Sequence, residues 1–450
     1  MIKIIKNSAL TMAVALTCSS TAFAVSEQEA ARLGQDLTPL GAEKAGNASG
    51  TIPAWTGGYK GGNPEGYVSG QPRKDLFPED KPRLVITSSN YKEHLDKLNA
   101  GIVKLFETYD DFRMDIYPTR RTGMAPQEVY EATKKNAITA TTSHNGYLLE
   151  NAIGGIPFPI PSTGLEAMWN HLTSYRGKST HDYFRTYVVP PNGEKVLASG
   201  TSQHWIYPYY GEGSFDGNAF AKAALENLEP SYKVGEAMLV YETLDNSING
   251  RKAWQYMAGQ RRVRRTPSLG YDTPDFVTSG SAFFDEAYIF SGGMNRFNWK
   301  LVGKKELYVP YNNNGYLEHS DDQTIGKHFL NPDYVRWELH RVWEVEATLA
   351  EGQRHAVAKR KLYLDEDTWL ALLVDGWDSN GELWRMSYGL PIVIPEGEFV
   401  VFRPWGTYDF IKGSYLVNGQ LNEGDAQMSV TEPKSERYFT PKALASRSLR

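Results

Sequence analysis

The stretch RWELHRVWEVEATL, residues 336–349, alternates between apolar and polar side chains. One face collects the odd-numbered positions, which are mostly apolar: Trp337, Leu339, Arg341, Trp343, Val345, Ala347 and Leu349. The opposite face is polar and carries Glu338, His340, Glu344 and Glu346. A period of two over this length indicates a β-strand that is half buried.

The segments that follow repeat this strand pattern. They are HAVAKRKLYL (355–364), WLALLVDGWD (369–378), ELWRMSYGL (382–390), VVFRPWG (400–406) and YDFIKGSYLVNGQL (408–421), and the turns DEDT and SNG separate the first three. In ELWRMSYGL, Trp384, Met386 and Tyr388 alternate with Arg385 and Ser387. Consecutive strands joined by tight turns predict an antiparallel meander.

The earlier half of the chain carries helix signals. Asn90 and Glu93 open a stripe of apolar residues, a weaker helix follows Pro126, and Thr163 with Glu166 forms a capping box for a third helix. The first stripe consists of Leu95, Leu98, Ile102, Leu105 and Phe106. Between the second and third helices, the prolines of GGIPFPIPSTG (154–164) predict a rigid extended connector.

A hairpin then begins the strand-rich part, because YFRTYVVPPNGEKVLASG (183–200) places two strand-like runs around Pro-Asn-Gly. Early helices and late strands predict an α+β protein, in which helices cover one face or the mouth of a large, curved, antiparallel sheet. Residues 25–82 are rich in Gly, Pro and small residues and predict an extended arm that lies over the body. Residues 83–450 are expected to form one domain, and the family resemblance given below implies that this domain is an open barrel.

Residues 1–24 have the features of a secretory signal peptide. Lys3 and Lys6 precede an apolar run that ends at Leu16, and Ala22-Phe23-Ala24 fits a cleavage site. We expect export to the periplasm and cleavage after Ala24. Cleavage there would remove Cys18, the one cysteine of the chain, so the mature protein would fold without disulfides.

The segment QRRVRRTP, residues 260–267, concentrates positive charge in Arg261, Arg262, Arg264 and Arg265. Nucleic-acid binding is disfavoured, because the formal net charge of the chain is -5 and such binding needs a positive surface. If one strand ran on from Tyr256, Arg262 would lie about 20 Å beyond it. The four guanidiniums would then either contact an anionic group at the rim of an apolar interior or pair with acids on neighbouring strands.

The aromatic residues of the strands are candidates for the lining of a ligand cavity. Aromatic residues make up 12% of the chain, and several of them alternate along the predicted strands. The candidate lining residues are Trp254, Tyr256, Trp337, Leu339, Trp343, Trp384, Met386 and Tyr388. The alternative is that these side chains fill a dry core, as aromatic strand residues commonly do.

Several long motifs resemble the domain of unknown function 1329 family: LTPLGAEKAGNASGTIPAWTGG, IPFPIPSTGLEAMWN, GQRRVRRTPSLGYDTP, NWKLVGKKELYVPYN and DEDTWLALLVDGWDSNGELWR. The resemblance implies an exported protein with a fold like that of the lipoprotein carriers LolA and LolB, an open antiparallel half-barrel with an apolar cavity covered by helices. It further implies a neighbouring resistance-nodulation-division-type transporter and an outer-membrane-associated partner. It supplies no catalytic residues.

These features together favour a periplasmic carrier or chaperone for a lipid, a lipoprotein or another amphiphile, without a metal or a cofactor. An exported hydrolase is an alternative, with Asp365, Glu366, Asp367, Asp375 and Asp378 as candidate acids. No G-x-S-x-G, H-E-x-x-H or P-loop motif supports it. An outer-membrane barrel is disfavoured by charge on both faces of several predicted strands, and an adaptor role in an envelope complex is compatible with the carrier hypothesis.

Overall fold

The computed structural model describes residues 25–211, 219–248, 250–266, 269–423 and 427–448. The predicted signal peptide, residues 1–24, lies outside this range. The helices are α1 (Glu27–Ala30), α2 (Ala100–Thr108), α3 (Gln127–Thr139), α4 (Gly164–Leu172), α5 (Asp321–Thr324) and α6 (Pro441–Ser448). Within the described ranges, no helix has the length and apolar character needed to cross a bilayer.

The strands fall into an early and a late group. The early strands are β1 (Leu84–Thr87), β2 (Arg113–Ile116), β3 (Thr141–Ser143), β4 (Leu148–Glu150), β5 (Ser179–Val189), β6 (Val196–Ile206), β7 (Ala221–Glu229), β8 (Ala237–Glu242), β9 (Arg251–Met257) and β10 (Arg262–Arg265). The late strands are β11 (Phe297–Pro310), β12 (Trp337–Leu349), β13 (Lys359–Asp365), β14 (Ala371–Trp377), β15 (Leu383–Ile394), β16 (Phe399–Asp409), β17 (Ser414–Gln420) and β18 (Ser429–Val430).

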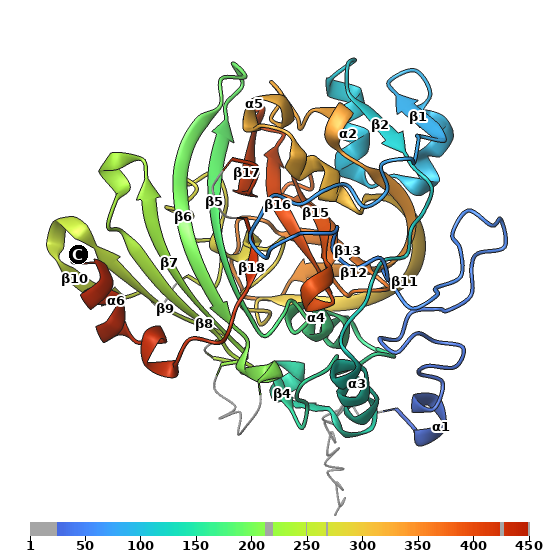
Figure 1. Cartoon of the computed structure of the whole chain (residues 1–450), viewed down its shortest axis with the longest axis horizontal. Coiled ribbons are helices and arrows are strands. Elements are labelled where there is room, and N and C mark those ends of the chain that lie inside the picture. Colours follow the sequence, from blue (N-terminus) through green and yellow to red (C-terminus); the bar gives the residue numbers. More distant parts are fainter. Residues whose placement is uncertain (1–24, 212–218, 249, 267–268, 424–426, 449–450) are drawn as a thin grey trace, which may run out of the picture.

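One 16-stranded sheet dominates the molecule, and β3 and β4 form a separate pair. The order along the main path of the large sheet is β1-β2-β12-β13-β14-β15-β16-β17-β5-β6-β7-β8-β9-β10 (Figure 1). Off this path, β11 pairs with β12 and β18 pairs with β5. Neighbours are antiparallel apart from a parallel contact between β2 and β12. Among the described strands, β10 pairs only with β9, so the sheet stays open. The predicted α+β fold with a large open antiparallel sheet is confirmed.

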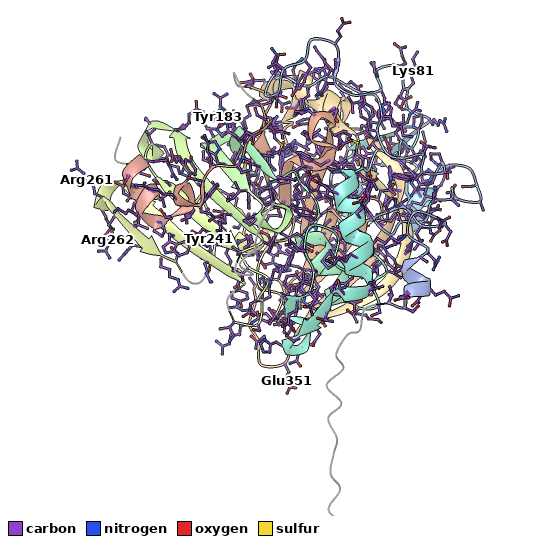
Figure 2. All side chains as sticks on the ribbon, turned by 60° about the horizontal axis from the view of Figure 1, so that its bottom comes forward. Lys81, Tyr183, Tyr241, Arg261, Arg262 and Glu351 are labelled. Atoms are coloured by element: carbon purple, nitrogen blue, oxygen red, sulfur yellow. The ribbon has the colours of Figure 1, made fainter. Side chains whose placement is uncertain are left out.

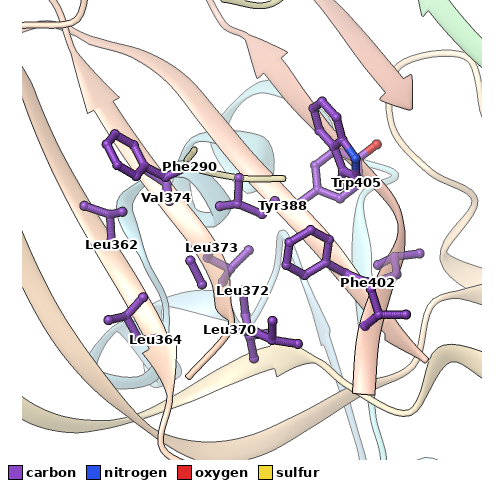
Figure 3. Close-up of a cluster of buried hydrophobic side chains, with 14 of the residues drawn as sticks. Phe290, Leu362, Leu364, Leu370, Leu372, Leu373, Val374, Tyr388, Phe402 and Trp405 are labelled. Carbon is purple, nitrogen blue, oxygen red and sulfur yellow. The ribbon is translucent and has the colours of Figure 1, made fainter. Parts of the chain in front are cut away.

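The late strands form the predicted meander and enclose the main hydrophobic core. Leu362 and Leu364 on β13, Leu372 on β14 and Phe402 on β16 are all 0% exposed, and Figure 3 shows them within one cluster of apolar side chains. Each fully buried side chain of this size contributes about 1.5–3 kcal/mol to folding. Pairing of β17 with β5 joins the late meander to the early one.

The prediction of one continuous helix from residue 90 onward is wrong, because the structure has two separate helices there. The structure has a 3-10 helix, η1 (Tyr91–Lys97), followed by α2, and the backbone at Leu98 is extended. Asp375 on β14 explains the break, because it accepts hydrogen bonds from Ala100 N (3.0 Å) and Gly101 N (2.8 Å) and thereby caps α2 from another element. A cap supplied from far along the sequence leaves no local signal.

The other two predicted helices are confirmed as α3 and α4. The Thr163 hydroxyl accepts a hydrogen bond from Glu166 N, and the Glu166 carboxylate accepts one from Thr163 N, which completes the predicted capping box of α4. The predicted arm, residues 25–82, contains the short helix α1 and no described strand. It contacts the body, for example through a hydrogen bond from Trp55 Nε1 to the carbonyl oxygen of Gly123 (3.0 Å). Arg73 of this arm forms an ion pair with Glu396 (2.6 Å).

Candidate ligand pocket

Four of the predicted lining residues lie in the packed core of the late strands. Trp337 is 7% exposed, Leu339 5%, Met386 1% and Tyr388 3%. Trp337, Met386 and Tyr388 border a void of about 20 Å³, which is close to the room that one water molecule needs. In the structure these four residues therefore pack into a core that is filled with side chains and do not line a ligand cavity. The alternation of apolar and polar residues is the same in both cases, so it could not distinguish them.

Trp343 and Trp384 are half-buried near the edges of this region. The Lys304 ammonium lies 5.0 Å from the centre of the Trp343 ring. The Trp384 indole nitrogen donates a hydrogen bond to Asp409 Oδ1 (3.0 Å). Both side chains therefore have structural contacts, and neither borders the pocket described below.

Trp254 and Tyr256 lie on the face of β9 that α6 covers. Tyr256 is 1% exposed and belongs to a small cluster with Phe439 and Leu444. Figure 1 shows α6 against the outer strands of the sheet. The alternation of these two residues was predicted correctly, but their side chains pack against a helix and not around a ligand.

The arginine run forms the second arm of a hairpin. Ala258–Gln260 makes a tight 3-10 turn, and Arg261 has a left-handed backbone with φ 49°, so Arg262 pairs with Met257 across the hairpin. The strand predicted to continue about 20 Å beyond Tyr256 therefore folds back beside it. All four arginines are exposed, and none forms an ion pair with a described residue, so the alternative of pairing with neighbouring acids is not seen there.

An apolar pocket lies elsewhere, against the inner face of the early strands. Its volume is about 70 Å³. The walls are Phe184 (β5), Gln203 and Trp205 (β6), Ala223 and Leu225 (β7), Met238, Val240 and Glu242 (β8) and Arg251 (β9), with Arg403, Trp405, Asn418 and Gly419 at the junction with β16 and β17. A largely apolar lining with a few placed polar groups is typical of a ligand site.

Residues 269–291, here called the strap, close the pocket over the sheet. The strap contributes Leu269, Asp275, Val277, Phe284, Ala287, Tyr288 and Ser291 to the lining. Leu269, Val277 and Phe284 are buried, whereas Ala287 and Tyr288 are partly exposed. The pocket is therefore an apolar sheet face covered by a loop, and its boundary toward solvent runs past Ala287 and Tyr288.

The Tyr288 hydroxyl holds the strap to the sheet. It accepts hydrogen bonds from Gln203 Nε2 (2.7 Å), Trp205 Nε1 (3.0 Å) and Arg403 Nη2 (3.1 Å). Arg403 is 2% exposed and also forms a buried ion pair with Asp182 (2.7 Å). Because burial raises the pKa of Tyr288, the hydroxyl stays protonated at neutral pH and its oxygen acts as the common acceptor.

Arg251 on β9 fastens the strap at several further points. Its guanidinium donates to the carbonyl oxygens of Leu269 (3.1 Å), Phe284 (2.9 Å) and Ser291 (3.1 Å). Its charge is balanced by Glu242 at 2.6 Å. One side chain of the sheet therefore binds both ends of the strap.

Asp275 organises a turn within the strap. Its Oδ1 accepts a hydrogen bond from Val277 N (2.8 Å), and its backbone pairs with Ala282. Burial raises the pKa of the Asp275 carboxyl to about 6, although the nearby charges of Arg251 and Lys233 oppose the shift. The carboxylate is therefore the most poorly compensated charge of the strap.

The acids considered for a hydrolase all have structural partners. Asp367 forms an ion pair with Arg121 (2.7 Å), and Glu366 forms one with Arg341 (2.6 Å). Asp375 caps α2, as described above, and Asp378 Oδ1 accepts the backbone N–H groups of its own turn. None of these carboxylates borders the pocket.

Asp365 belongs to a buried polar cluster at the end of β13. Its Oδ2 accepts hydrogen bonds from the hydroxyls of Tyr311 (2.9 Å) and Thr368 (2.6 Å), and its pKa is raised to about 6 by burial and by the neighbouring Asp367. One atom each of His340, Asp365 and Asp367 lie within 4.8 Å of one another. His340 Nε2 also forms a hydrogen bond with Glu338 Oε2 (3.0 Å).

Sequence reasoning missed most of the pocket. Its walls include the short segments AKAALENLE (221–229) and AMLVYE (237–242), whose small and aliphatic residues are weaker markers than tryptophan. Ala223 was the available signal, because a small residue on an inward strand position leaves space beside it. The strap has no hydrophobic period and could not be assigned to a face of the sheet.

The large open sheet, the helices and the apolar pocket beneath the strap define an α+β protein with a candidate ligand site. A family model described as a protein of unknown function, DUF1329, matches residues 85–445. An uncharacterized protein of Pseudomonas aeruginosa, PA3922, is 37% identical over 452 residues, covering 98% of this chain and 97% of the relative. The chain belongs to the DUF1329 family, as the sequence motifs predicted.

Three solved structures are similar to this chain at low identity. A domain from Vibrio parahaemolyticus, described as an outer membrane lipoprotein-sorting protein, has a TM-score of 0.42 at 14% identity and covers 63% of this chain and 98% of its own. A DUF1329 family protein from Desulfovibrio piger has a TM-score of 0.41 at 14% identity, covering 60% and 92%. The LolA superfamily protein NE2245 from Nitrosomonas europaea has a TM-score of 0.36 at 15% identity, covering 62% and 98%.

Proposed function

We propose that this protein is an exported carrier that holds the apolar chain of an amphiphile beneath the strap. The pocket supports this function most directly, because apolar side chains from four sheet strands face the strap across a small apolar space. Each CH₂ group exposed to water costs about 0.8 kcal/mol, so a chain of about 16 carbons would face roughly 12 kcal/mol without a carrier. An apolar site in a carrier removes most of this cost.

The present volume implies that the pocket is described in a closed state. At about 70 Å³ it is smaller than the cavity of about 150 Å³ that accommodates benzene. A long acyl chain therefore enters only if the strap moves away from the sheet. The strap is held by the hydrogen bonds of Tyr288 and Arg251 and by buried ion pairs of Asp285 with Arg360 (2.8 Å) and of Glu286 with Arg385 (2.6 Å). Opening has to separate these contacts while the strands stay paired.

Arg264 lies where it can contact an anionic head group of the cargo. It pairs with Gln255, Gln255 pairs with Met238, and Met238 pairs with Leu225, so these side chains form one row across the sheet. Met238 and Leu225 line the pocket, and Arg264 lies two strands, about 10 Å, from Met238. A guanidinium at this distance suits a carboxylate or phosphate whose chain enters the pocket.

The cellular setting is also part of the proposal. Residues 1–24 favour the periplasm, and the family resemblance favours transfer of cargo to or from a resistance-nodulation-division-type transporter and an outer-membrane partner. The proposed cargo is a lipid, a lipoprotein acyl chain or a related amphiphile, bound without a cofactor.

Filling the pocket tests the proposal. We expect Ala223→Leu to weaken binding of dansyl-labelled undecanoic acid at least tenfold, because it adds apolar volume to a wall that is 0% exposed. Ala31→Leu adds the same group to an exposed position and is the control. Native mass spectrometry and organic extraction of the purified wild type should also reveal an apolar-chain adduct.

The same assay tests the role of Arg264. Arg264→Glu should weaken binding of the labelled acid and leave binding of the matching labelled alcohol unchanged, because only the acid carries a charge. Unchanged binding of both probes in Ala223→Leu, with the fold intact by circular dichroism, would contradict the proposed site.

A further inference from the structure

The end of β7 and the turn between β7 and β8 present apolar side chains to solvent. Tyr232 is 76% exposed, Val234 52% and Leu228 48%. Lys233 lies between the first two, is buried, and its Nζ donates a hydrogen bond to the carbonyl oxygen of Phe276 in the strap (3.2 Å). This inward anchor holds the turn against the strap while Tyr232 and Val234 remain exposed on either side of it.

The hairpin of β9 and β10, which carries Arg261 and Arg262, lies beside this turn. Strand β8 pairs with β9 with Ala237 opposite Tyr256, which places the turn at 230–236 next to the turn at Ala258–Gln260. A Cβ placed on Gly235 would lie 3.7 Å from the Cβ of Ala258. Figure 2 shows Arg261 and Arg262 at an extremity of the molecule, and neither is in an ion pair with a described residue.

We propose that these residues dock the protein on the surface of an anionic phospholipid membrane. The docking patch consists of Leu228, Tyr232, Val234, Arg261 and Arg262. Aliphatic and aromatic side chains that project from a turn can enter the headgroup boundary, and unpaired arginines are attracted to anionic lipids. A specific protein partner would need about 800 Å² from each side and roughly 20–30 residues, which two turns do not supply.

The docking patch adds a membrane contact to the proposed carrier function, and this inference rests on that proposed function. Lys233 joins the docking turn to the strap through Phe276, and the strap covers the pocket. A docked molecule therefore holds the strap and the adjacent end of the pocket close to the membrane, where an apolar chain can pass between bilayer and protein with little exposure to water.

Vesicle flotation tests the docking patch. The probe is a vesicle of phosphatidylethanolamine and phosphatidylglycerol at three to one, mixed with the chain from Val25 onward, which contains every described residue. We expect Tyr232→Ser with Val234→Ser to reduce vesicle affinity at least tenfold, and Arg261→Gln to reduce it about fivefold and only at low salt. Ile411→Ser, at a 62% exposed position on the turn between β16 and β17, should change nothing.

The outcomes separate docking from cargo binding. The Tyr232→Ser, Val234→Ser variant should bind dansyl-labelled undecanoic acid as the wild type does, because neither residue lines the pocket. If the wild type binds the acid but not the vesicles, or if the double variant floats as well as the wild type, the docking proposal is wrong and the carrier proposal is unaffected. If Ala223→Leu loses binding of the labelled acid but still floats with the vesicles as the wild type does, the result supports both the carrier proposal and the docking proposal.

Discussion

At the scale of single residues, the pocket is bordered by charges whose burial is compensated to different degrees. Arg403 and Asp182 neutralise each other at 2.7 Å, and Arg251 and Glu242 do so at 2.6 Å. Breaking such a pair usually costs about 3–5 kcal/mol because one charge is left buried alone. Asp275 has no such ion pair with a residue that the structure describes, and burial raises its pKa to about 6.

This difference predicts a pH-dependent effect of Asp275→Asn. The unfolded chain loses the Asp275 proton near its ordinary pKa of about 3.9, whereas the folded chain keeps it until about 6. Because the folded state binds more protons between these values, the contribution of Asp275 to stability falls as pH rises from about 4 to 6. The asparagine variant should therefore be more stable than the wild type at pH 7.5, by up to about 3 kcal/mol, and equal to it near pH 4.

Urea denaturation at several pH values measures this difference. The variant should keep the turn of the strap, because an amide oxygen can still accept the hydrogen bond from Val277 N. Asp110→Asn, on the surface, is the matched control. A stability difference for Asp275→Asn that does not change between pH 4 and pH 7.5 would show that the carboxyl is not buried as described.

The sequence correctly predicted which side chains share a face of a strand, but it did not predict what packs against that face. Trp254 and Tyr256 share a face as expected, but α6 covers that face, and nothing near residue 255 indicates a helix almost two hundred positions later. Arg262 was predicted to continue the strand of Tyr256, but the chain turns at Arg261 and Arg262 lies on the next strand. The turn was missed because a left-handed backbone, as at Arg261, is unusual for a residue other than glycine. Both errors depend on contacts or conformations that local pattern does not encode.

At the scale of elements, the strap has to move before a ligand can enter the pocket, and the hydrogen bonds of Tyr288 oppose that movement. The Tyr288 hydroxyl is the shared acceptor for Gln203, Trp205 and Arg403. Tyr288→Phe removes that acceptor and leaves buried donors unsatisfied, so we expect a loss of about 1–3 kcal/mol in unfolding free energy. Hydrogen exchange of residues 269–291 should become faster, because the strap would open more often.

Tyr271→Phe is the matched control for the strap. Its hydroxyl donates to Asn295 Oδ1 (2.8 Å) and does not contact the sheet strands of the pocket. It should leave exchange in the rest of the strap close to that of the wild type. If both variants accelerate exchange equally, Tyr288 has no special part in holding the strap.

Elements defined by local signals could be predicted, and elements defined by distant contacts could not. The late meander, the hairpin of β5 and β6, and α4 with its Thr163–Glu166 capping box all match the expectations. The pairing of β17 with β5, which makes one sheet from two meanders, joins Tyr415 to Val189 across more than half the chain. The strap lacks any period of two or 3.6 and acquires its role only from this long-range arrangement.

At the scale of the whole molecule, one sheet performs two tasks. The late strands β12–β17 close around a filled core in which side chains such as Leu364 and Phe402 are 0% exposed, and this half gives stability. The early strands β5–β9 carry an apolar face that the strap covers. Because Phe284 and Phe290 of the strap also belong to the main core, we expect the pocket to open by movement of the strap while the strands stay paired. The expected hollow therefore exists beside the early strands and not among the late ones.

Tryptophan quenching by dibromostearic acid tests the central claim most directly, because bromine quenches only indoles that it touches. Trp205 and Trp405 line the pocket, whereas Trp337 lies in the filled core and Trp254 beneath α6. We predict saturable quenching in the wild type, and loss of most of it in a Trp205→Phe, Trp405→Phe variant that still binds dansyl-labelled undecanoic acid. Quenching that persists in this variant would place the ligand elsewhere and contradict the account.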